Sequence, residues 1–231
     1  MYVFPHPDDE SFGPAAGIAH QVRSGRNVSL LTLTRGGATR QRHHFGYSVG
    51  EMGAVRLGEL QRAAKVLELT DLAVLDFPDG GLKEITPMVL EEAVRVQIER
   101  VRPAVVVTYP VHGITGHPDH VVTHAVVKRV YCELRERVAP YLKRLAFFTL
   151  REAPEGGPIR LTATPAGEID CDVPVRAEDA EIQHRALDCY ETYRAFIETS
   201  GIREMTGIPV CYEIFQERYD PPLEDLCDRL M

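Results

Sequence analysis

The 231-residue sequence lacks several features that would place it in common protein classes. Its five cysteines are odd in number, widely spaced and without a C-x-x-C pair, which argues against a disulfide framework and a thiolate zinc site. No apolar run approaches the length that crosses a bilayer, and no basic segment followed by an apolar one opens the chain. We therefore expect a cytoplasmic protein with free thiols and no membrane association.

Basic residues are in the minority as well. The formal net charge is −8 at pH 7, with 26 Lys and Arg against 34 Asp and Glu. Because a phosphate backbone attracts clustered basic side chains, we expect no nucleic-acid partner. One local basic group stands out against this background and consists of Arg35, Arg40, Arg42, His43 and His44.

The chain does contain a regular alternation of apolar, β-branched runs and segments of helical period. Strands are expected at residues 2–4, 28–33, 72–77, 104–109 and 145–150, and helices at 13–24, 51–67, 87–101 and 118–138. Strict alternation favours right-handed crossovers, so we predict an α/β fold: a three-layer sandwich with a mostly parallel sheet between two helical layers.

The remaining residues are less regular. After residue 150 we expect a Pro- and Gly-containing stretch, a helix at 177–199 and a strand at 210–215. Since no Pro- or Gly-rich linker divides the chain, we interpret residues 1–231 as a single domain. Its core would be residues 1–150, and residues 151–231 would be an extension that could cap a site.

Two clusters of titratable residues follow predicted strands. His6-Pro7-Asp8-Asp9-Glu10 comes directly after the first strand, and His117-Pro118-Asp119-His120 comes in the loop after the fourth. In open parallel sheets, ligands bind beyond the carboxyl ends of the strands, where the strand order reverses. We therefore expect the two clusters to meet around one divalent cation.

The spacing suggests which side chains bind that cation. His6 and Asp9, three residues apart across a turn that opens a helix, can converge on one ion, and His120 is the third predicted ligand. Three ligands leave a fourth position for water, as in catalytic zinc sites. His124 lies one turn beyond His120 and is an alternative that ranks below it. Zn²⁺ is the expected cofactor, although such a set also accepts Fe²⁺, Co²⁺ or Mn²⁺.

The other residues of the clusters offer acid and base groups. Asp8 can remain uncoordinated, and a helix start favours its ionised form, so it is the predicted general base. His117, near the start of a helix whose first position suits Pro118, is the predicted acid or oxyanion donor, charged with help from Asp119. Each motif alone is common in plain turns, and only their conjunction favours a hydrolase.

The sequence HPDDE after the first strand, with GHPDH at residues 116–120, resembles the LmbE/PIG-L family of zinc-dependent de-N-acetylases. Segments 31–37, 56–67 and 77–82 agree with the family's pattern in the same order, so the resemblance covers roughly residues 1–150. It implies a Rossmann-like fold and hydrolysis of the acetamide of an N-acetylglucosamine conjugate. His6, Asp9 and His120 then correspond to the metal ligands, Asp8 to the base and His117 to the group that stabilises the tetrahedral intermediate.

The resemblance also points to substrate contacts. Arg56 and Asp79 match family positions associated with the sugar, and Arg35, Arg40 and Arg42 could bind a carboxylated group such as malate. The favoured specific function is a bacillithiol-pathway deacetylase that acts on N-acetylglucosaminyl malate.

Other functions stay open. The alternatives are a deacetylase of another acylated amine or sugar, and a non-catalytic metal- or sugar-binding protein with the same fold. A nucleotide-dependent transferase is a more distant possibility, because Gly36-Gly37 is a weak phosphate signal and no G-x-G-x-x-G or Walker pattern follows. A homo-oligomer would be ordinary for an enzyme of this size.

Overall fold

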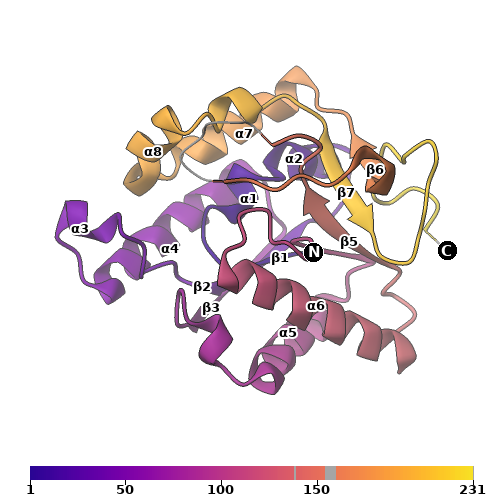
Figure 1. The fold of residues 1–231 in the computed structure, drawn as a ribbon, viewed down its shortest axis with the longest axis horizontal. Coiled ribbons are helices and arrows are strands. Elements are labelled where there is room, and N and C mark those ends of the chain that lie inside the picture. The colour runs from indigo at the N-terminus through magenta and orange to yellow at the C-terminus, as the bar shows by residue number, and fades with distance from the viewer. Residues whose placement is uncertain (138, 154–159, 231) are drawn as a thin grey trace.

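The computed structural model describes residues 1–137, 139–153 and 160–230 and is built around one seven-stranded sheet (Figure 1). The strand order is β3-β2-β1-β4-β5-β7-β6. The strands are β1 (Tyr2–Phe4), β2 (Ser29–Thr34), β3 (Asp71–Phe77), β4 (Val105–Thr108), β5 (Arg144–Thr149), β6 (Cys171–Val173) and β7 (Val210–Ile214). β1 to β5 are mutually parallel, whereas β7 is antiparallel to both β5 and β6. The predicted mostly parallel sheet is confirmed.

Helices cover both faces of this sheet (Figure 1). They are α1 (Asp9–Phe12), α2 (Ala15–Arg23), α3 (Arg42–Phe45), α4 (Val49–Val66), α5 (Pro87–Val101), α6 (Pro118–Glu136), α7 (Ala177–Asp188) and α8 (Arg194–Thr199). Short 3₁₀ turns occur at η1 (Leu82–Glu84), η2 (Ala166–Glu168), η3 (Glu191–Tyr193) and η4 (Arg203–Met205). The apolar core under α2, α4 and α7 lies on one face, and that under α5 and α6 on the other. The predicted three-layer sandwich is thus confirmed.

Burial on both faces explains why the central strands are apolar throughout. In β1, Tyr2 and Phe4 pack into one core and Val3 into the other, and each is at most 1% exposed. In β4, Val105 and Val107 face the first core and Val106 the second. A strand covered on both faces needs apolar side chains at consecutive positions.

The reversal of strand order places the two sequence clusters together. From β1 the chain adds β2 and β3 on one side of the sheet, and then β4 and β5 on the other. The backbone N–H and the hydroxyl of Thr34 both donate to the carbonyl of Pro5, which ties the end of β2 to the loop after β1. The loops after β1 and β4 therefore begin side by side at the switch point.

Local predictions differ from the structure at several places. The helix expected at 13–24 is confirmed as α2, but a separate short helix, α1, precedes it and ends at Gly13, where any Cβ would collide with the ring of Phe148. The helix expected at 177–199 is broken into α7, η3 and α8, because buried Glu59 accepts hydrogen bonds from both the N–H and the hydroxyl of Thr192. α3 and β6 were not predicted. For the helix expected at 118–138, α6 ends at Glu136, and Val138 lies outside the described residues.

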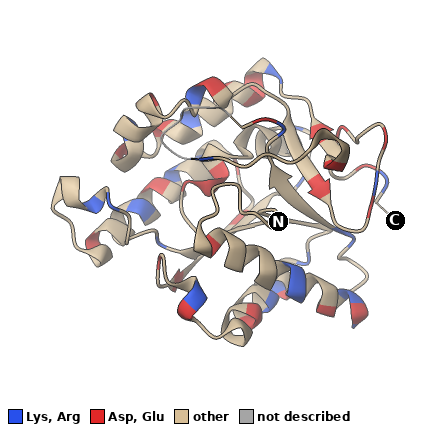
Figure 2. Cartoon of the chain, viewed as in Figure 1, with Lys and Arg blue, Asp and Glu red and all other residues tan. Residues whose placement is uncertain are grey.

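Residues after 150 join the same sheet and the same helical layer. β7 pairs with β5, and α7 packs against α2 and α4. This continuity supports the interpretation of one domain, although residues 154–159 of the expected irregular stretch lie outside the description. Acidic and basic side chains are interspersed along the helices (Figure 2). Among the helices described, none combines the length and apolarity that a membrane span needs.

Candidate metal and active site

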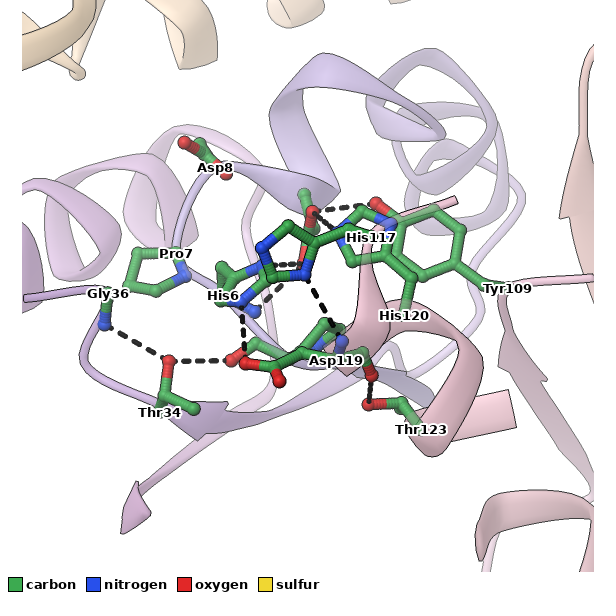
Figure 3. Close-up of polar contacts among 12 residues, drawn as sticks. His6, Pro7, Asp8, Thr34, Gly36, Tyr109, His117, Asp119, His120 and Thr123 are labelled. Carbon is green, nitrogen blue, oxygen red and sulfur yellow. Dashed lines mark hydrogen bonds and ion pairs between the residues drawn. The ribbon is translucent and has the colours of Figure 1, made fainter. Parts of the chain in front are cut away.

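His6 follows β1 and lies close to Asp119 and to the ring of His117 (Figure 3), and the carboxylates of Asp79 and Asp9 are also within 4 Å of its imidazole. Its Nε2 is 3.2 Å from both Oδ2 of Asp119 and Oδ1 of Asp79, and its Nδ1 is 3.6 Å from Oδ2 of Asp9. Burial lowers the pKa of His6, but the hydrogen bonds to Asp119 and Asp79 outweigh it and raise the pKa to about 10. The surroundings of this imidazole therefore favour a positive charge, whether a proton or a metal ion supplies it.

Asp9 lies between the imidazoles of His6 and His120. Its Oδ1 is 3.4 Å from Nε2 of His120 and accepts a hydrogen bond of 2.7 Å from the hydroxyl of Tyr109. Neighbouring ligand atoms on a tetrahedral ion with bonds of about 2.0–2.1 Å lie roughly 3.3–3.4 Å apart. The contacts of 3.4 and 3.6 Å that Asp9 makes with the two imidazoles are of that order, but they involve its two different oxygens, Oδ1 and Oδ2. The carboxylate thus lies next to both imidazoles, and the role of the three side chains as joint ligands stays a prediction.

His120 is held in the orientation of a metal ligand. Its Nδ1 donates to the carbonyl of Gly113 at 2.9 Å, and its ring stacks on Tyr109 with centroids 4.1 Å apart. Gly113 has φ +64°, and a Cβ there would crowd the Cβ of His120. Burial lowers the pKa of His120 and keeps the ring neutral, as a ligand must be. Its Nε2 is thereby directed at Asp9.

His117 occupies the N-cap of α6, close to the predicted position. Its Nδ1 accepts the backbone N–H of Asp119 at 3.2 Å, so a neutral ring carries its proton on Nε2. The ring centroid lies 4.9 Å from that of His6 and 5.3 Å from that of His120. Burial lowers the pKa of His117. The expected charging by Asp119 is not found, because that carboxylate hydrogen-bonds to His6 and to two backbone amides instead.

Two sets of ligand atoms converge in the described part of the chain: His6 with His117 and His120, and His6 with Asp79 and Asp119. The carboxylates of the second set are already engaged. Asp79 accepts the N–H of Ala38 at 2.7 Å, and buried Asp119 accepts those of Gly80 and Leu82 at 2.8 and 3.1 Å. We therefore interpret both as outer partners that orient His6.

His124 joins neither set. Its Nδ1 donates to the carbonyl of Tyr109 at 2.9 Å, and its ring packs on Phe147. The structure thus brings His120 rather than His124 to His6 and Asp9, in line with the predicted ranking.

Asp8 is separated from the imidazole group, and Figure 3 shows it to one side of His6, His117 and His120. Its backbone is left-handed, with φ +92°, an uncommon conformation that its neighbours must stabilise. The carboxylate accepts a hydrogen bond from Arg56. Burial raises the pKa of Asp8 to about 8, against the lowering effect of the guanidinium. A buried carboxyl with such a pKa suits proton transfer near neutral pH.

Arg56, from α4, is only 2% exposed and holds the loops around the predicted base. Its guanidinium donates to the carbonyls of Gly36 and Pro7 as well as to Asp8, and it lies over the ring of Tyr193 at 4.7 Å. Gly36 has φ +65°, and any Cβ there would collide with the guanidinium. The absence of a side chain at Gly36 therefore leaves room for the guanidinium of Arg56. Contact between Arg56 and a sugar stays a prediction.

A cavity of about 730 Å³ lies over these groups. Its lining includes most of the predicted site residues: His6, Asp8, Asp9, Arg40, Arg56, Asp79, His117 and His120. Asp119 is buried beneath the cavity, with no exposed surface. Of the basic group, Arg40 lines the described cavity, but Arg35 and Arg42 do not; Arg35 instead pairs with Asp76 at 3.2 Å.

Some residues of this site were not predicted from the sequence. Tyr109 fixes both Asp9 and His120, and Tyr193 covers Arg56. Tyr109 ends the Val-rich run beside the switch point, and a polar aromatic residue at that place was an available signal. Tyr193 carried no such signal, because it comes from a distant, irregular segment.

The fold and this geometry define an α/β protein with a histidine- and aspartate-lined centre at the switch point. The model of the PIG-L family, described as GlcNAc-PI de-N-acetylase, matches residues 1–131. A probable N-acetyl-α-D-glucosaminyl L-malate deacetylase 2 of Bacillus anthracis is 31% identical over 160 residues, which are 68% of this chain and 70% of the relative. The chain therefore belongs to the PIG-L de-N-acetylase family, as its motifs indicated.

A second curated relative and a solved structure are also similar to this chain. A 1D-myo-inositol 2-acetamido-2-deoxy-α-D-glucopyranoside deacetylase of Salinispora arenicola is 33% identical over 152 residues, 57% of this chain and 49% of the relative. The chain thus spans about half the length of this curated relative. The zinc-inhibited form of the teicoplanin deacetylase Orf2 superposes with a TM-score of 0.69 over 92% of this chain and 96% of that one. Its identity is 16%, so it shows the shared fold alone.

Proposed function

We propose that the protein is a metal-dependent hydrolase that removes the N-acetyl group from an N-acetylglucosamine conjugate. The single observation that carries this proposal is the meeting of the two motifs, in which the ring nitrogens of His6, His117 and His120 converge and Asp9 lies 3.6 Å from His6 and 3.4 Å from His120. Family membership supports it, because the two curated relatives compared above are both named for deacetylation of a 2-acetamido sugar.

Zn²⁺ is the proposed ion, and His6, Asp9 and His120 would hold it. When bound, such a cation lowers the pKa of a coordinated water and polarises the amide carbonyl. The outer contacts from Asp119, Asp79 and the Gly113 carbonyl orient the imidazoles for this purpose. Fe²⁺, Co²⁺ and Mn²⁺ suit the same donor atoms, and metal analysis distinguishes them.

The side chains beside the ligands would move the protons. Asp8 takes the proton of the attacking water and delivers it to the nitrogen of the leaving amine, so the protons balance over one turnover. His117, fixed by the Asp119 amide, donates from Nε2 to the acetamide oxygen as negative charge develops there. Arg56 holds the Asp8 carboxylate in place throughout. The products are acetate and the free amino sugar.

N-acetylglucosaminyl malate, in bacillithiol synthesis, is the specific substrate that the sequence favours. The name of the Bacillus anthracis relative and the position of Arg40 on the cavity lining support it. Cytoplasmic location belongs to the same proposal, and the five free cysteines support a reducing compartment.

Metal analysis followed by an amine-release assay tests the function. The panel comprises N-acetylglucosaminyl malate, N-acetylglucosaminyl inositol and N,N'-diacetylchitobiose. We expect about one zinc per chain and amine release that stops on chelation. Equal rates on the anionic and neutral sugars would remove the malate assignment. A metal-loaded protein that releases no amine from any member would instead be the non-catalytic binding protein.

A further inference from the structure

We propose that the cavity contains an apolar subsite beside the metal-ligand residues, and that the substrate carries an alkyl, acyl or aryl group that fills it. This inference rests on the proposed function and names the class of substrate. The subsite is lined by Phe12, Phe148, Leu150, Phe196, Ile202 and Met205. These side chains come from α1, from β5 and the residue after it, from α8, and from η4 and the residue before it.

The apolar side chains are anchored on one side and open to the cavity on the other. Phe12 stacks on Phe196 with ring centroids 6.1 Å apart, and Phe12 and Ile202 also pack against the small core under α7 and α8. The ring of Phe148 packs against Gly13, and this residue is 5% exposed. Apolar surface that remains in contact with water beside a polar centre is typical of a ligand-binding groove.

The charge of the cavity agrees with this assignment. Among the described lining residues, the Lys and Arg side chains are Arg40 and Arg56, and Arg56 already pairs with Asp8. Malate has no alkyl or aryl group for these side chains, so the apolar subsite is an alternative to the malate assignment within the same deacetylase function, and the panel of sugars above distinguishes the two. A volume of about 730 Å³ is that of pockets that hold drug-sized ligands, so the cavity has room for a group beyond the N-acetylated sugar.

Two substrate series on the zinc-loaded protein test the proposal and locate the apolar group. The first varies the glycoside of N-acetylglucosamine from methyl to butyl to hexyl; the second varies the N-acyl group of the methyl glycoside from acetyl to butanoyl to hexanoyl. Concentrations stay below micelle formation. We expect kcat/KM for amine release to rise up to about fourfold per methylene in one series. A rise with the glycoside places the group on the retained amine, and a rise with the acyl chain places it on the released acid.

Flat or falling kcat/KM in both series would overturn the subsite while leaving deacetylation in place. A second readout does not depend on turnover: both series should raise the midpoint of thermal unfolding, and the longer members should raise it more. If no member releases amine, the proposed function fails, but the thermal shifts still decide about the subsite. Shifts that do not change with chain length would refute it.

A matched pair of variants ties the effect to the subsite. Phe196→Ala should reduce the ratio of kcat/KM between hexyl and methyl substrates by at least about threefold, because it removes part of the apolar lining. Phe45→Ala removes an aromatic ring that is 47% exposed in α3, outside the lining, and should keep the ratio of the unmodified protein. Identical ratios in the two variants would contradict the assignment.

Discussion

At its polar end the cavity is built from two short motifs, and at its apolar end from single side chains of distant segments. Residues 6–9 and 117–120 supply the polar end, where hydrogen bonds fix the direction of each ring and carboxylate. Phe12, Phe148 and Phe196 contribute to the apolar end, where packing fixes position. The difference separates two tasks, because proton and metal chemistry depends on direction, whereas selection of an apolar group depends on area.

One contact between the two ends is that of Arg56 with Tyr193. Arg56 holds Asp8 on one side and lies under the ring of Tyr193 on the other. Tyr193 in turn hydrogen-bonds to Thr39, and the neighbouring Thr192 is held by Glu59. The segment that carries the apolar lining is thus attached to the loops that carry the chemistry, and variants at either end can show how far the two tasks are independent.

The largest effect is expected at the polar end, from His120→Ala compared with His124→Ala. Both histidines are buried on α6, one turn apart, but only His120 faces Asp9. His120→Ala should lose bound zinc and lower kcat/KM by roughly a thousandfold or more, since several kcal/mol of metal-dependent stabilisation are lost. His124→Ala should keep its zinc and lose stability. Metal content and amine release measure both, and the reverse result would make His124 the ligand.

A second effect separates the base from the ligands. Asp8→Asn should keep its zinc yet lower kcat by about 10²–10⁴-fold, because the amide cannot accept the proton of the attacking water. Asp71→Asn is the control. Asp71 forms an exposed ion pair with Arg100 at the start of β3, whereas the site lies beyond the carboxyl ends of the strands. Steady-state kinetics measure kcat in both variants, and metal analysis measures their zinc content. An unchanged kcat in Asp8→Asn would remove Asp8 from the mechanism.

Arg56 offers a smaller effect at the contact between the two ends. Arg56→Lys should lower kcat about ten- to a hundredfold with little change in KM, because an ammonium cannot serve Asp8 and two carbonyls at once. Arg62→Lys, a half-exposed arginine on the same helix, is the control. A raised KM with an unchanged kcat would instead favour the predicted contact with the sugar.

The polar end could be predicted from the sequence because its residues are neighbours in short motifs. A parallel sheet brings the carboxyl ends of β1 and β4 to one edge, so strand alternation alone placed residues 6–9 beside residues 117–120. The partner of Asp119 could not be predicted in the same way. Its carboxylate reaches His6, Gly80 and Leu82, and these contacts depend on how the loop after β3 folds over α6.

The apolar end was beyond sequence reasoning for a different reason. Its lining comes from four segments whose spacing has no common period, and the helix expected at 177–199 concealed the break at residues 189–193. That break depends on a hydrogen bond to Glu59, which is distant in sequence, and tertiary contacts of this kind override local helix propensity. Arg40 lines the cavity, and its contact with a substrate stays a prediction, whereas Arg35 forms an exposed ion pair with Asp76 and does not line the cavity. Proximity in sequence thus did not show which arginine of the basic group reaches the cavity.

The smallest effect is expected where the apolar end is attached. Glu59 is 1% exposed, and its two oxygens accept the N–H of Thr192 at 2.8 Å and the hydroxyl at 2.7 Å. Glu59→Gln places an amide group against these donors and should lower the free energy of unfolding by about 1–3 kcal/mol, as measured by urea denaturation. Glu99→Gln, on the exposed surface of α5, should change it by less than about 0.5 kcal/mol. Equal stability of the two variants would mean that packing alone holds α8 over the cavity. The position of α8 would then not depend on this hydrogen-bonded link to α4.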